Sequence, residues 1–118
     1  MAELETQATT LNGVKILTAS LDGLDRSQMR VLADSLRNKW KSAVIVLAGG
    51  DDGAVSIVSG VTKDLTGKVQ AGKLVGQVAL AIGGKGGGRP DMAEGGGKNA
   101  GALAGALRAV HSTIEAAL

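Results

Sequence analysis

Apolar residues in the first third of the chain follow two different spacings. Residues 13–20 are rich in β-branched side chains, which is typical of a β-strand. Over residues 26–40 the apolar positions recur every three or four residues, which predicts an amphipathic helix. Asp25 precedes this segment and Gln28 stands three positions later, which is the spacing of a capping box. The helix is therefore expected to begin directly after Asp25.

Two further strands are predicted after this helix. Residues 43–48 are continuously apolar and too few for a helix of their own, so they predict a central strand buried on both faces. Residues 54–61 have the composition of a second strand, which is expected to pair with the first as a hairpin. The intervening residues 49–53 are glycines and aspartates and are expected to form the turn.

The second half of the chain is predicted to contain two helices. Apolar residues recur at helical spacing within residues 70–82 and again within residues 99–118, whereas residues 62–72 are expected to form a loop. The apolar face of the last helix consists of Leu103, Leu107, Val110, Ile114 and Leu118. This order of elements predicts an α/β fold, in which a single mixed β-sheet has helices packed on it.

The length of 118 residues is that of one domain. Residues 13–118 contain every predicted element and are assigned to the globular domain. Residues 1–12 are polar and unpatterned, and are expected to be a tail or the remnant of a preceding helical segment. The chain has neither a signal-peptide pattern nor an apolar run of about 20 residues. We therefore expect a soluble, cytoplasmic protein without a membrane partner.

Residues 83–97 form the most unusual segment, because they contain eight of the 19 glycines of the chain. Glycines at this density cost conformational entropy and are expected where the backbone approaches another group closely. Exposed N–H groups in such a loop bind anions. This segment therefore predicts a phosphate-binding loop, although residue types alone also allow a flexible linker. The candidate contacts are Lys85, Gly86, Gly87, Gly88, Arg89 and Lys98.

The distribution of charge supports an anionic partner. The net charge is only +2, but residues 37–98 contain nine Lys or Arg against five Asp or Glu. Such a surface attracts phosphates in a salt-dependent way. The secondary candidate contacts are Lys63, Lys68 and Lys73. Trp40 is the only aromatic residue, which disfavours the base-stacking modes of most single-strand binders.

The residues that could support catalysis are few. The chain has no Cys and a single His, His111, so a zinc site is not predicted. Asp91 and Glu94 have no feature of an acid–base pair, and Asp91 is expected to accept hydrogen bonds from amides of the glycine-rich segment. Neither a Walker A loop nor a dinucleotide-binding βαβ unit is predicted. We therefore expect no catalytic residues, no metal ligands and no cofactor.

Residues 83–96 read GGKGGGRPDMAEGG, which resembles a signature near the C-terminal end of bacterial alanyl-tRNA synthetases. The resemblance covers about residues 13–118, and its most specific part runs from Arg89 to Ala93. It implies a DHHA1-like fold, the C-Ala domain of that family. In the related DHH-type phosphoesterases a His commonly follows the glycines. Arg89 stands at that position here and favours the synthetase branch.

The resemblance implies tRNA as the partner, contacted at the outer corner of its L shape. It further implies that this module helps the aminoacylation and editing domains of one ligase share one tRNA, and that catalysis resides in those other domains. Two alternatives remain open from the sequence. The chain could be an interaction or homodimerisation module, using Gly101, Gly105 and the stripe from Leu103 to Ile114, or the substrate-binding domain of a DHH-type phosphoesterase.

Overall fold

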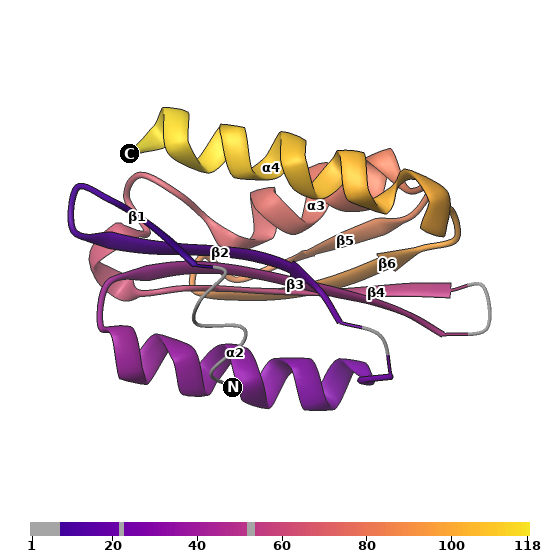
Figure 1. Ribbon diagram of the computed structural model, residues 1–118, viewed down its shortest axis with the longest axis horizontal. Helices are drawn as coiled ribbons and strands as arrows, with labels where there is room; N and C mark the ends of the chain where they lie inside the picture. Colours follow the sequence, from indigo (N-terminus) through magenta and orange to yellow (C-terminus); the bar gives the residue numbers. More distant parts are fainter. Residues whose placement is uncertain (1–7, 22, 52–53) are drawn as a thin grey trace.

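The computed structural model describes residues 8–21, 23–51 and 54–118. It contains a six-stranded sheet with the strand order β1-β2-β3-β4-β6-β5 (Figure 1). The elements in chain order are β1 (Thr9–Leu11), β2 (Val14–Ser20), α2 (Arg26–Trp40), β3 (Ala43–Asp51), β4 (Ala54–Val61), the 3-10 helix η1 (Lys63–Leu65), α3 (Ala71–Ala81), β5 (Lys85–Gly88), β6 (Met92–Gly97), the 3-10 helix η2 (Ala100–Ala102) and α4 (Leu103–Ala117).

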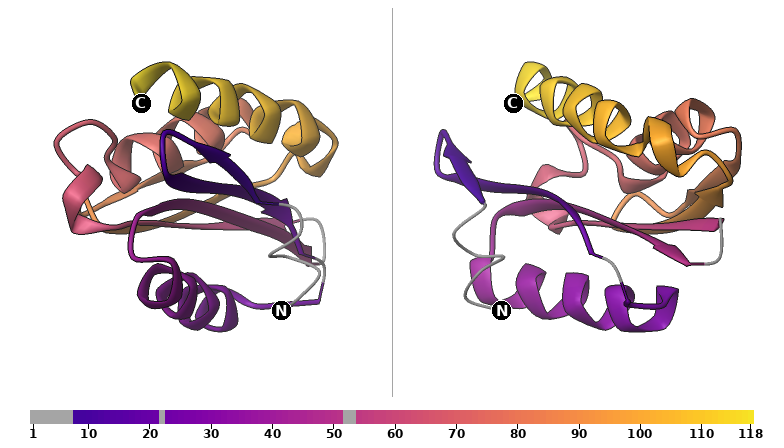
Figure 2. Two further views of the ribbon diagram at one scale, coloured as in Figure 1. Left: turned by 60° about the vertical axis from the view of Figure 1, so that its left-hand side comes forward. Right: turned by 45° about the vertical axis from the view of Figure 1, so that its right-hand side comes forward.

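The sheet is mixed, as predicted. β2 and β3 run parallel because α2 connects them, and the other neighbouring strands are antiparallel. α2 packs on one face over β3 and β4, whereas α3 and α4 cover the opposite face (Figure 2). Each face has its own buried cluster, with Leu36 and Leu47 on the α2 side and Val78 and Ile114 on the other. The predicted α/β class with a single mixed sheet is confirmed.

The capping box at the start of α2 is also confirmed. The amide of Gln28 donates to Asp25 Oδ1 at 2.8 Å, and the amide of Asp25 donates to Gln28 Oε1 at 2.9 Å. These two bonds give acceptors to amides that have none within the helix, because no turn precedes them. The helix begins at Arg26, the position expected from the sequence.

Replacing Asp25 with alanine is expected to lower the free energy of unfolding by about 1 kcal/mol, the usual loss for an N-cap. Urea denaturation followed by circular dichroism measures it. Ser27→Ala is the matched control, because it removes a hydroxyl from the same turn without touching the cap, and should change stability by less than about 0.5 kcal/mol. Equal effects of the two changes would show that the cap contributes nothing.

Three predicted boundaries were wrong. Thr9–Leu11, expected to lie in a tail, form the edge strand β1 against β2. Gly49 and Gly50, expected in a turn, continue β3 and pair with Ser56 and Val55; Asp52 and Gly53 of that predicted turn lie outside the described residues. The predicted loop 62–72 contains η1 and ends earlier than predicted, because α3 begins at Ala71; the helix predicted at residues 70–82 is confirmed as Ala71–Ala81.

Among the described residues, no helix has both the length and the apolar composition needed to cross a membrane.

Candidate nucleic-acid interface

The glycine-rich segment is a β-hairpin rather than a loop. β5 and β6 pair antiparallel, with Lys85 opposite Gly96, Gly86 opposite Gly95 and Gly87 opposite Glu94. β6 in turn pairs with β4, so the hairpin completes one edge of the sheet. We call residues 85–97 the glycine hairpin. The prediction of a loop was wrong because glycine composition hides the strand signal that side chains normally supply.

Three of the six glycines of the hairpin allow α3 and the residue that ends it to pack closely on the sheet. A Cβ atom at Gly86 would lie 2.5 Å from Val75 Cγ1, and one at Gly95 would lie 2.7 Å from the same atom. A Cβ atom at Gly97 would lie 2.5 Å from Ile82 Cγ1. Real Cβ atoms do not approach other atoms so closely, so these positions require glycine for internal packing. Gly86 therefore lies in a strand rather than in an open loop, and its contact with an anion stays a prediction.

Gly87 differs from its neighbours. Successive residues of a strand face opposite sides, so Gly87 and Lys85 face away from α3, on the side of the sheet that bears α2. A Cβ atom at Gly87 would meet nothing within 4 Å, and the residue is exposed. Gly88, by contrast, has a φ of +155°, and its Cβ would lie 2.9 Å from Ala93 Cα. Gly87 is thus the hairpin residue on β5 for which neither packing nor conformation requires glycine.

On this side of the sheet α2 covers β3 and β4 and leaves a hollow beside the hairpin. Three arginines surround the hollow, Arg26 and Arg30 from α2 and Arg89 from the turn between β5 and β6. We call it the arginine hollow; its lining consists of Arg26, Arg30, Gly87, Gly88, Arg89, Met92, Ala93 and Glu94. Its lining side chains carry three positive charges and one negative charge.

The arginines of α2 were not among the candidates predicted from the sequence. Arg26, Arg30 and Arg37 stand at i, i+4 and i+11, which places them within one narrow stripe of a helix with 3.6 residues per turn. The charge count concealed them, because Arg26 and Arg30 fall in the acidic first part of the sequence. Helical spacing of the basic residues, rather than their number, would have identified them.

Arg26 and Arg30 are held over the hairpin by contacts with β6. Arg26 Nη2 donates to the carbonyl oxygen of Gly95 at 3.0 Å. Arg30 Nη1 lies 3.5 Å from Glu94 Oε1, and the Arg30 side chain is 58% exposed. Among the described residues Arg26 has no carboxylate partner. Both guanidinium groups therefore retain donors that can bind an anion.

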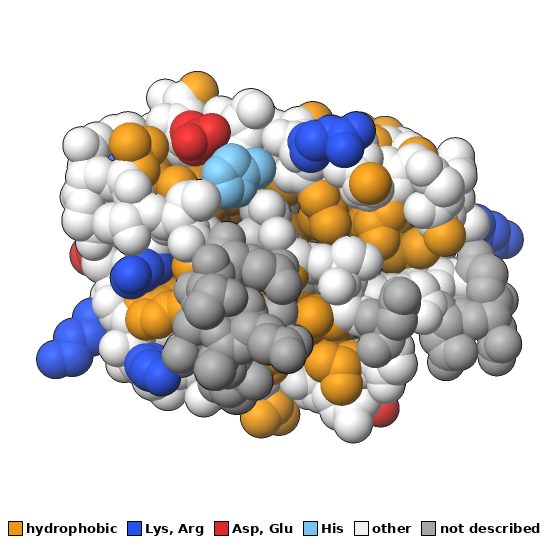
Figure 3. Space-filling model, viewed as in Figure 1, with side chains coloured by type: hydrophobic (Ala, Val, Ile, Leu, Met, Phe, Trp, Pro, Cys, Tyr) orange, Lys and Arg blue, Asp and Glu red, His pale blue; other side chains and the backbone are white. Residues whose placement is uncertain are grey.

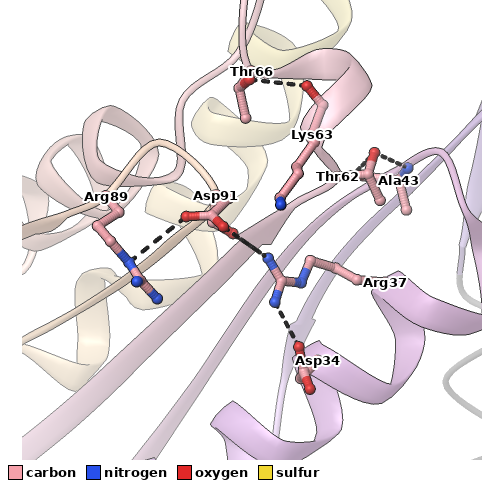
Figure 4. Close-up of polar contacts among 8 residues, drawn as sticks. All are labelled: Asp34, Arg37, Ala43, Thr62, Lys63, Thr66, Arg89 and Asp91. Carbon is pink, nitrogen blue, oxygen red and sulfur yellow. Dashed lines mark hydrogen bonds and ion pairs between the residues drawn. The ribbon is translucent and has the colours of Figure 1, made fainter.

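Asp91 connects the hairpin turn to α2 (Figure 4). Its carbonyl oxygen accepts hydrogen bonds from Arg37 Nη1 at 2.9 Å and from the Val61 amide at 3.0 Å. Its carboxylate lies 3.7 Å from Arg37 and 3.7 Å from Arg89. The prediction that this carboxylate accepts from amides of the glycine segment was wrong. Arg37 is held by these contacts and by Asp34, whereas the Arg89 side chain is 75% exposed.

A second hollow lies on the α2 side, toward the C-terminal end of that helix. Its lining includes Arg37, Lys41, Lys63 and Asp91. A hydrogen bond from the Ser42 hydroxyl, 2.6 Å from Asp64 Oδ2, lowers the pKa of the Asp64 carboxyl, and Thr62 adds to the effect. Asp64 therefore remains ionised at neutral pH and offsets part of the charge of the neighbouring Lys63.

The predicted contact residues thus separate into two groups. Lys85, Gly87, Gly88 and Arg89 lie on or beside the arginine hollow, and Lys63 lines the second hollow. Lys68, Lys73 and Lys98 line neither of the two. Lys73 is on α3, on the opposite face of the sheet, and Lys98 follows β6 where its amide bonds to the Ile82 carbonyl.

The side of the molecule that carries β1, β2 and α4 differs in character. Figure 3 shows apolar side chains between the sheet and α4, with Lys and Arg side chains scattered rather than gathered. His111 lies on this side, half-buried, with Nδ1 3.2 Å from the Thr18 hydroxyl. Within the described part of the chain no group of three His, Asp or Glu side chains could hold a metal ion.

The proposed interaction stripe on α4 is not available to a partner. Leu103, Leu107, Val110 and Ile114 are all buried in the core against the sheet and α3. Gly101 and Gly105 are exposed, as the interaction hypothesis required. The helix therefore uses its apolar face within the domain. Its exposed face includes Gly105 together with charged residues such as Arg108 and Glu115, and Gly101 lies just before it in η2.

Comparisons with known proteins agree on one family. Residues 13–116 match the family described as the DHHA1 domain. The chain is 61% identical over its whole length to an alanine–tRNA ligase of Solibacter usitatus and 49% identical over 98% of its length to that of Thiobacillus denitrificans. It spans only 13% of each of these relatives.

Solved structures show the same relationship. The chain is similar to the C-Ala domain of Aquifex aeolicus alanyl-tRNA synthetase, with a TM-score of 0.84, 27% identity, and coverage of 92% of this chain and 97% of that domain. A pGpG-specific phosphodiesterase from Vibrio shares the fold at 13% identity and a TM-score of 0.55, with 99% of this chain matching 38% of that one. The latter likeness concerns the fold alone.

Proposed function

Because the chain belongs to the DHHA1 domain family, we propose that it is the tRNA-binding accessory module of an alanine–tRNA ligase. The observation that carries this proposal is the row of arginines from α2 beside the glycine hairpin, in a chain 61% identical to such a ligase. The planar guanidinium group of arginine matches the spacing of two phosphate oxygens and presents several N–H donors to one phosphate. The proposed partner is therefore the phosphate backbone of tRNA.

The composition of the surface favours recognition of shape over sequence. Trp40 is the only aromatic side chain and is half-buried against the α2-side core, so base stacking contributes little. Contacts from Arg and Lys to phosphates position a protein without reading bases. This agrees with a module that holds the outer corner of tRNA while other domains of the same ligase perform aminoacylation and editing. The module itself would supply no catalytic residue and no cofactor.

Replacing Lys85 and Arg89 together with alanine is expected to weaken tRNA binding by about tenfold and to reduce its dependence on salt. Each lost phosphate contact lowers the slope of log affinity against log salt by about 0.7 to 0.9. The measurement is fluorescence titration of labelled tRNA at two salt concentrations, about 50 and about 200 mM. Wild-type affinity that is indifferent to salt, or a double variant that binds like wild type, would count against this surface.

A module that contacts other domains or a second copy of itself is the alternative. The exposed Gly101 and Gly105 would provide its surface, without the buried apolar stripe. Sedimentation distinguishes the two proposals. A wild-type chain that forms a dimer, loses it on Gly105→Leu and has no affinity for tRNA would support the interaction module and contradict the tRNA proposal. The substrate-binding role in a DHH-type phosphoesterase has weaker support, because Arg89 replaces the expected His and the likeness to that class is at 13% identity.

A further inference from the structure

Gly87 is unexplained by the fold. The other glycines around it prevent clashes with α3 or with the opposite strand, but a Cβ at Gly87 would meet nothing within 4 Å. Its φ is not in the left-handed region where glycine is favoured. Glycine in a strand weakens the strand, so a residue with a side chain would be the more stable choice here. A glycine with no internal reason on an exposed strand is typical of close approach by a ligand.

The surroundings of Gly87 specify the charge of that ligand. Arg26 and Arg30 reach over β6 from α2. Arg89 lines the same hollow and directly follows Gly88, the last residue of β5. Lys85 projects to the same side, two positions before Gly87 on the strand. The one carboxylate lining the hollow, Glu94, lies opposite Gly87 and pairs with Arg30 at 3.5 Å. The arrangement suits a single anionic group resting on bare backbone.

We infer that one backbone phosphate of the bound RNA sits in the arginine hollow directly over Gly87, between Arg26, Arg30 and Arg89. This inference rests on the proposed function and locates it at one position. Arg89 exchanges its 3.7 Å contact with Asp91 for the phosphate, and Arg30 exchanges its contact with Glu94. Both existing pairs are long and involve exposed arginines, so little is lost when they separate. Gly87 lets the sugar–phosphate chain lie against the strand.

Glu94 is then a competitor for the phosphate. Replacing Glu94 with glutamine removes a negative charge from the lining and frees Arg30, so tRNA affinity is expected to rise about two- to threefold, the size of a partly exposed charge pair.

The decisive variants are Gly87→Ala and Gly87→Val in the whole 118-residue chain. Valine there is expected to hold the phosphate away from the strand and so to cost about one charge-assisted hydrogen bond to an arginine. This weakens tRNA binding on the order of tenfold, with a smaller effect for alanine. Urea denaturation should show no loss of stability for either. The matched control is Gly105→Ala on α4, where a Cβ would meet only Arg108 Nη2 at 4.0 Å, and it should leave affinity unchanged.

The titration separates this inference from the proposed function. Wild-type binding with a weakened Gly87→Val variant and an unchanged Gly105→Ala variant supports the phosphate position. Wild-type binding that Gly87→Val leaves unchanged overturns the position and leaves the tRNA proposal standing. A wild-type chain without tRNA affinity overturns both. Inorganic phosphate that binds and shifts the Gly87 amide signal while tRNA does not bind would show a site for free phosphate instead, and would overturn the inference for RNA.

Discussion

Replacing Gly95 with valine is expected to lower the free energy of unfolding by more than about 3 kcal/mol, the upper end of the usual cost of overpacking. Gly95 is buried, and a Cβ there would lie 2.7 Å from Gly86 Cα, 2.7 Å from Val75 Cγ1 and 2.9 Å from the Lys85 carbonyl oxygen. Two of these neighbours are backbone atoms and cannot rotate away. The branched side chain would force α3 away from the glycine hairpin or separate β5 from β6.

The matched control is Gly87→Val, which introduces the same side chain on the opposite face of the same hairpin. It should change the free energy of unfolding by less than about 0.5 kcal/mol, because nothing lies within 4 Å of its Cβ. Urea denaturation of the two variants measures the difference. Similar midpoints for both would contradict the conclusion that the hairpin glycines serve the packing of α3.

Reversing two charges on α2 has the largest expected effect on binding. The double variant Arg26→Glu/Arg30→Glu replaces two positive charges at the arginine hollow with two negative ones. Removal of two phosphate contacts, with repulsion added, is expected to weaken tRNA binding by about a hundredfold or more at low salt. Stability should be little affected at position 26, because a glutamate in the first turn of α2 interacts favourably with the helix dipole.

A control is available elsewhere on the chain. Lys15→Glu/Arg108→Glu makes the same change in net charge, with Lys15 on β2, at the far side of the sheet from β5, and Arg108 on α4. General electrostatic attraction would respond equally to both double variants, whereas a localised interface would respond to one. Comparison of the two therefore isolates the position of the charges from their number.

The sequence predicted the packing elements well because their signals are local. The capping box of Asp25 and Gln28 and the apolar spacing after it identified the start and end of α2. The apolar run after Ser42 identified β3, since a strand buried on both faces needs no alternation. These patterns are set by neighbours within a few residues, so no knowledge of distant parts of the chain was required.

The glycine hairpin could not be predicted in this way. Its strands have almost no side chains. Three of its glycines, Gly86, Gly95 and Gly97, are required by Val75 of α3 and by Ile82 at the end of that helix. The same limit applies to the site. Arg26 lies over Gly95 although 69 residues separate them in the chain. Only the β4–β6 pairing and the position of α2 on β4 bring the arginines and the hairpin together.

The surface between α2 and the glycine hairpin is the proposed binding site for tRNA. The most direct test is a titration of labelled tRNA against wild type, Arg26→Glu/Arg30→Glu and Lys15→Glu/Arg108→Glu at one low salt concentration, with folding of each chain verified by circular dichroism. We predict loss of about a hundredfold in affinity for the α2 variant and less than about threefold for the control. Equal losses in both variants, or retained binding by a folded α2 variant, would contradict the claim.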